Sequence, residues 1–88
     1  MIASLTRYWF EFDRSVSKLA VIVPFAGVTA WSEEDAMELL RQRMFQHSEM
    51  PPIMSVSHNI DINGLDDKHV LKNMGPANIR GIWYPLGH

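Results

Sequence analysis

The chain has 88 residues and no cysteine, so neither a disulfide nor a thiolate-bound metal holds its fold together. A chain this short buries only about 60 to 65% of its unfolded surface, so its hydrophobic core must be efficient. Hydrophobic residues make up 47% of the sequence, with three Trp, four Phe and two Tyr among the aromatic residues, which is ample for a globular core. We therefore expect residues 1–88 to form a single domain.

Two segments in the first third of the chain are expected to form strands. In residues 5–13, aromatic residues alternate with Trp9 and two acidic residues, which predicts one core face and one partly wet face. The residues of the core face are Tyr8, Phe10 and Phe12. Residues 18–25 form an apolar run rich in β-branched residues, which predicts the central second strand of an antiparallel hairpin. Gly27 is expected to allow a bend after this strand.

A helix is predicted to begin at Glu33. Ser32 is a typical N-cap residue, because its hydroxyl accepts a backbone N–H three residues on, and the acidic residues after it favour a helix start. The helix should extend to about Gln46. Its apolar residues recur at helical spacing and predict a face packed on a sheet; they are Ala36, Leu39, Leu40 and Met44.

Two more strands are expected in the second half of the chain. Alternation in residues 53–60 predicts a third strand, with Ile53 on the same face as the serines that follow it. Residues 66–74 could form a short helix. Residues 80–86 should form the last strand, at an edge of the sheet because Pro85 has no N–H to donate. In such a strand Trp83 and Tyr84 point to opposite faces.

The expected order of elements is strand, strand, helix, strand, short helix or loop, strand. This ββαβ(α)β order predicts a small α+β two-layer sandwich, with one helix packed on a mixed sheet. The order resembles that of β-grasp domains, which is our first choice among such folds.

Little in the sequence indicates catalysis. The cluster of Asp66, Asp67 and His69 is the one group of potential metal or acid–base ligands, but its spacing does not match a calcium loop. A capped turn explains these residues better, so a small metal-dependent enzyme centred on them is the alternative. We expect no enzymatic activity and no cofactor.

Charge argues against nucleic acid as a partner. The formal net charge is −2, whereas nucleic-acid binders usually carry a basic excess. Binding of single-stranded nucleic acid through Trp9, Arg7 and Arg80 is kept as a further alternative that the charge does not favour. The longest apolar run, residues 19–26, is too short to cross a bilayer, so no membrane association is expected.

The surplus of aromatic residues predicts a surface that binds another protein. Aromatic residues near an arginine are typical of binding hot spots. We expect a non-enzymatic interaction module of the adaptor, inhibitor or immunity type, acting in the cytoplasm, and an exposed edge strand could also pair two copies into a homodimer. The candidate partner-binding residues are Trp9, Trp31, Arg80, Trp83 and Tyr84.

Overall fold

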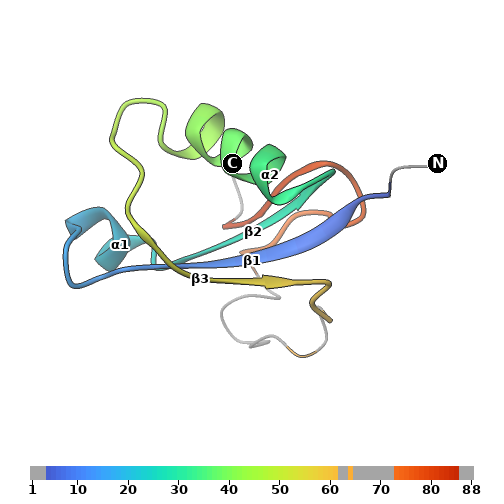
Figure 1. The fold of residues 1–88 in the computed structure, drawn as a ribbon, viewed down its shortest axis with the longest axis horizontal. Helices are drawn as coiled ribbons and strands as arrows, with labels where there is room; N and C mark the ends of the chain where they lie inside the picture. The colour runs from blue at the N-terminus through green and yellow to red at the C-terminus, as the bar shows by residue number, and fades with distance from the viewer. Residues whose placement is uncertain (1–3, 62–63, 65–72, 86–88) are drawn as a thin grey trace.

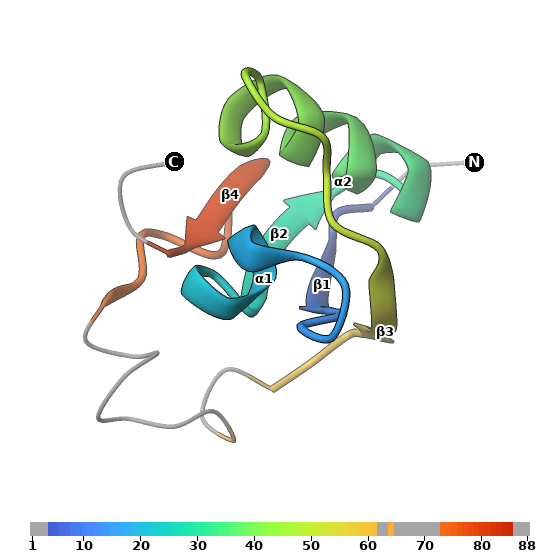
Figure 2. The same ribbon diagram turned by 90° about the vertical axis from the view of Figure 1, so that its left-hand side faces the viewer.

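The computed structural model describes residues 4–61, 64 and 73–85. Helix α2 and the turn that continues it cover one face of a four-stranded sheet, and α1 lies at one end of the sheet (Figures 1 and 2). The two-layer α+β fold is therefore confirmed. The elements are β1 (Thr6–Phe12), α1 (Lys18–Ile22), β2 (Phe25–Ala30), α2 (Glu33–Leu39), η1 (Leu40–Met44), β3 (Ile53–His58) and β4 (Gly81–Tyr84).

The strands follow the order β3-β1-β2-β4, and each neighbouring pair is antiparallel. The predicted mixed sheet is therefore wrong, whereas the edge position of the last strand is confirmed. The more specific β-grasp order is not confirmed.

The core lies between the sheet and α2. Tyr8, Phe10 and Phe12 point into it as predicted, and the two phenylalanines are fully buried. Ala36, Leu39 and Leu40 meet them from the helix side, so the predicted apolar stripe of the helix is confirmed.

The apolar run over residues 18–25 is not a strand. Residues 18–22 form the short helix α1, whose N-cap Ser17 accepts a hydrogen bond from the backbone N–H of Ala20 at 3.4 Å. Of this helix only Ala20 is buried, and Ile22 is 76% exposed. The central second strand is β2, which begins after Pro24, and Gly27 lies inside it rather than at a bend.

The predicted long helix is present but changes its winding. After Leu39 the chain forms the π-helical turn η1, and the backbone N–H of Phe45 donates to the carbonyl of Leu40, five residues earlier, at 2.9 Å. This wider turn accompanies the burial of Phe45, whose ring packs edge-on against Phe12 with centroids 5.4 Å apart.

Two register shifts alter which side chains share a face. One lies between β1 and β3, where Ile53 is opposite Phe12 and packs on the core together with Val56. The prediction that Ile53 shares the serine face is therefore wrong. The other lies between β2 and β4, where Ile82 pairs with Val28 and Tyr84 pairs with Gly27, leaving Trp83 as an extra residue.

Candidate functional site

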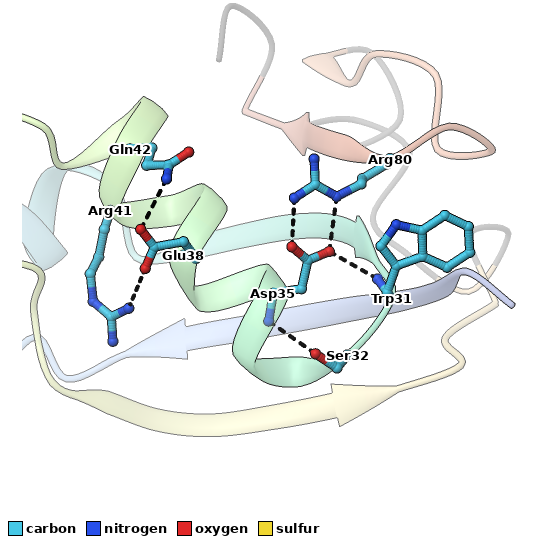
Figure 3. Close-up of polar contacts among 7 residues, drawn as sticks. All are labelled: Trp31, Ser32, Asp35, Glu38, Arg41, Gln42 and Arg80. Carbon is cyan, nitrogen blue, oxygen red and sulfur yellow. Dashed lines mark hydrogen bonds and ion pairs between the residues drawn. The ribbon is translucent and has the colours of Figure 1, made fainter. Parts of the chain in front are cut away.

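One carboxylate joins the N-terminus of α2 to the residue before β4. Asp35 accepts two hydrogen bonds from Arg80, at 2.9 Å from Nε and 2.5 Å from Nη2, and a third from the backbone N–H of Trp31 at 3.1 Å (Figure 3). The backbone N–H of Asp35 in turn donates to the hydroxyl of Ser32 at 3.1 Å, which confirms the predicted N-cap. Asp35 thus fixes both the helix start and the Arg80 side chain.

These contacts bring Trp31 and Arg80 together. Figure 3 shows the Trp31 indole beside the ion pair of Arg80 with Asp35. The Trp31 side chain is 52% exposed, and Ile79, which precedes Arg80, is also exposed. We call Trp31 and Arg80 the Trp31 surface. Because Trp and Arg are the residues most often found as anchors in protein interfaces, this arrangement is suited to binding a partner.

The ion pair also sets the protonation of Asp35. The hydrogen bonds from Arg80, and then the one from the Trp31 N–H, lower the pKa of Asp35 from 3.8 to about 2. Both stabilise the ionised carboxylate, whereas the slight burial of the group opposes them. Asp35 is therefore charged throughout the physiological range and holds Arg80 there.

The other predicted site residues lie on the sheet face opposite α2. Trp9 stacks against Phe25 and Trp83, with ring centroids 5.5 and 5.8 Å apart, and its ring is 5.4 Å from that of Tyr84. These four residues form the outer aromatic cluster. Since both Trp83 and Tyr84 contact Trp9, the prediction that they point to opposite faces is wrong, and the extra residue in β4 is the reason.

Trp83 is the centre of this cluster and is only 1% exposed. In the described part of the chain, its indole Nε1–H is the one buried side-chain polar atom that lacks a hydrogen-bond partner. Leaving such a donor unsatisfied costs about 1–3 kcal/mol. Contacts of the Trp83 ring, such as its stacking on Trp9, must offset this cost. Because it is buried, Trp83 contributes to the fold rather than to an exposed surface.

The five predicted site residues thus form two groups. Trp31 and Arg80 meet at the Trp31 surface, whereas Trp9, Trp83 and Tyr84 pack together in the outer aromatic cluster. The sequence prediction missed Asp35, which links the members of the first group. Its place in the first helical turn suggested only a favourable dipole interaction, and nothing local indicated its contact with Arg80, 45 positions away.

No metal centre is found in the described residues, where no three His, Asp or Glu side chains come together. The cluster of Asp66, Asp67 and His69, and most of the short helix predicted over residues 66–74, lie outside the described residues. Among residues 4–61, 64 and 73–85, no helix has the length and apolar character needed to cross a membrane.

The chain matches no protein-family model, no curated protein and no solved structure. Its function is therefore inferred from its own residues.

Proposed function

We propose that this chain is a small non-enzymatic interaction module, of the adaptor, inhibitor or immunity type, and that it binds another protein through the Trp31 surface. The observation that carries the proposal is the half-exposed Trp31 indole beside an arginine that is already fixed in place. A large aromatic side chain in water gains free energy when a partner covers it.

Pre-organisation supports the same proposal. Trp31 directly follows the buried end of β2 and precedes the helix cap, and its N–H is bound to Asp35. Arg80 is held by two hydrogen bonds to the same carboxylate. Binding would therefore cost less conformational entropy here than on a mobile loop, because the Trp31 backbone and the Arg80 side chain are already held.

The other predicted aromatic residues give less support to nucleic-acid binding. The Trp9 indole already stacks on Phe25 and Trp83, and Arg80 is neutralised by Asp35. No observation favours a base-stacking platform here. We place the proposed binding in the cytoplasm, because a chain without cysteine suits a reducing compartment.

The test is affinity capture of the tagged full chain from its own cells, with quantitative mass spectrometry. Wild type is compared with Trp31→Ala and with Met54→Ala, which removes a similarly exposed apolar side chain from β3. We expect a partner that wild type and Met54→Ala retain equally, and that Trp31→Ala loses by about tenfold or more. Arg80→Gln should weaken the same complex in titrations of the purified partner.

Trp31→Ala and Met54→Ala should both keep the thermal unfolding midpoint near that of wild type, since the removed side chains are exposed. Equal enrichment by wild type and Trp31→Ala would remove the Trp31 surface from the proposal. Enrichment of no protein above an untagged control would argue against the interaction function itself.

A further inference from the structure

A pocket of about 310 Å³ opens on the sheet face opposite α2, at the end of β1 and β2 where Arg7 and Thr29 pair. Its volume is at the lower end of the range for small-ligand sites. Strands β1 and β2 and the segments after β3 and before β4 all contribute to its lining. The described residues that line it are Leu5, Arg7, Thr29, Asn59, Ile60, Ala77 and Asn78.

Arg7 is fixed in this pocket by one end of its guanidinium group. Its Nε donates to the carbonyl of Ala77 at 3.3 Å, and the Thr29 hydroxyl donates to the same carbonyl at 2.7 Å. The Thr29 side chain is buried, so this carbonyl is held firmly. Because Nε makes this contact, and no hydrogen bond joins the terminal nitrogens of Arg7 to another described residue, both of these nitrogens can bind a ligand.

No protein carboxylate neutralises Arg7 among the residues that the structure describes. The ion pairs found there join Arg14 to Glu11, Arg41 to Glu38, His58 to Glu33 and Arg80 to Asp35. Among the described residues, Arg7 is thus a half-buried cation without a carboxylate partner. A planar guanidinium in this state is suited to a two-point contact with a carboxylate.

The rest of the lining favours the same ligand chemistry. Asn59 and Asn78 contribute neutral amides that can donate to an oxygen, whereas Leu5, Ile60 and Ala77 contribute apolar surface. A single cation matches one negative charge, while a phosphate dianion would keep an uncompensated charge in the pocket.

We infer that this pocket binds a carboxylate carried on a short aliphatic group, with Arg7 as its anchor. The carboxylate contacts the terminal nitrogens of Arg7, and its aliphatic portion contacts Leu5 and Ile60. A free small organic acid and the C-terminus of a peptide ending in a small apolar residue share this chemistry. The site does not depend on the proposed function, because Trp31 is not part of its lining.

The test is an NMR titration of the isotope-labelled full chain with butanoate and with butanamide, its neutral counterpart. Butanoate should shift the backbone amide signals of Arg7, Thr29 and Asn78 in a saturable way, and butanamide should not. Equal shifts with butanamide, or saturable shifts only at other residues, would overturn the inference. Inorganic phosphate binding more tightly than butanoate would overturn the assignment to a carboxylate.

Two peptides distinguish the sources of the carboxylate. They share a sequence that ends in alanine, one with a free C-terminus and one with an amidated C-terminus. Tighter binding of the free peptide than of butanoate assigns the pocket to a chain end, and tighter binding of butanoate assigns it to a small acid. Equal binding of the free and amidated peptides at this pocket would count against any carboxylate site.

Three variants test the residues of the pocket. Arg7→Gln should weaken binding at least tenfold, whereas Arg14→Gln, which removes the same charge elsewhere, should leave it unchanged. Asn78→Asp changes an exposed side chain, so it should fold normally while its charge repels the ligand. Undiminished binding by Asn78→Asp would contradict the inference even if Arg7→Gln failed to fold.

Discussion

At the scale of single residues, Gly27 decides whether the outer aromatic cluster can form. A methyl group at this position would lie 2.5 to 2.6 Å from three ring carbons of Trp83, well inside van der Waals contact. Trp83 is buried and has little room to move away. We therefore expect Gly27→Ala to destabilise the protein by about 1–3 kcal/mol, as overpacking usually does, in chemical denaturation followed by tryptophan fluorescence.

Gly64→Ala is the matched control, since no heavy atom of the described residues lies within 4 Å of the position its methyl group would take. Its unfolding free energy should stay within about 0.5 kcal/mol of wild type. If Gly27→Ala were as stable as this control, the Trp83 ring would not lie over Gly27 as described.

The sequence could not reveal this contact. The sequence predicts a bend at Gly27, because glycine next to an apolar run commonly allows one, but in the structure Gly27 makes room for a ring from another strand. The same limit applies to Trp83 and Tyr84. Strict alternation puts them on opposite faces, and only the pairing with β2 reveals the extra residue that brings both to Trp9.

At the scale of elements, the contact between Asp35 and Arg80 ties α2 to β4. The pKa of Asp35 in the folded protein is lowered to about 2, below its ordinary value of 3.8. A lowered folded pKa means that the carboxylate stabilises the fold above about pH 4 and that this contribution is lost as the pH falls toward 2. Arg80→Gln should move the Asp35 midpoint back toward 3.8, measured by NMR titration of the side-chain carboxyl carbon.

Arg41→Gln provides the control for this titration. Arg41, in η1, is also an exposed arginine and pairs with Glu38 of α2 at 3.1 Å, but it does not contact Asp35. The Asp35 midpoint should therefore stay near 2 in this variant. A wild-type midpoint near 3.8, or the same low midpoint in Arg80→Gln, would mean that Arg80 does not hold Asp35 in solution.

The elements that the sequence predicted well are those with local signals. The N-cap at Ser32 and the alternation around Phe10 depend on neighbouring residues, and both were correct. The run over residues 18–25 has no such signal, because a short apolar run rich in β-branched residues fits a strand or a helix equally. The cap at Ser17 and the interruption at Pro24 decide in favour of a helix followed by a strand.

At the scale of the whole molecule, the two-layer arrangement could be predicted from the sequence, but the Arg7 pocket could not. One amphipathic helix and several strands leave few ways to bury the apolar residues, so the layers follow from the pattern. The Arg7 pocket depends instead on contacts such as that of Arg7 with Ala77, 70 positions apart. Such a site depends on how segments far apart in the sequence pack together. No local pattern of residues predicts that packing.

The sheet also has an edge that supports the predicted homodimer. β3 is an edge strand of six residues without proline, lysine or arginine, the residues that commonly protect edges, and its Ser57 is exposed. We expect two copies to pair antiparallel along β3, giving a mass of twice 10.1 kDa in light scattering at high protein concentration.

Ser57→Lys should restore the monomer, because it adds charge to both paired strands, whereas Ser48→Lys, outside the sheet, should not. A wild-type mass of 10.1 kDa at every concentration, or a dimer that Ser57→Lys leaves intact, would exclude pairing through this edge.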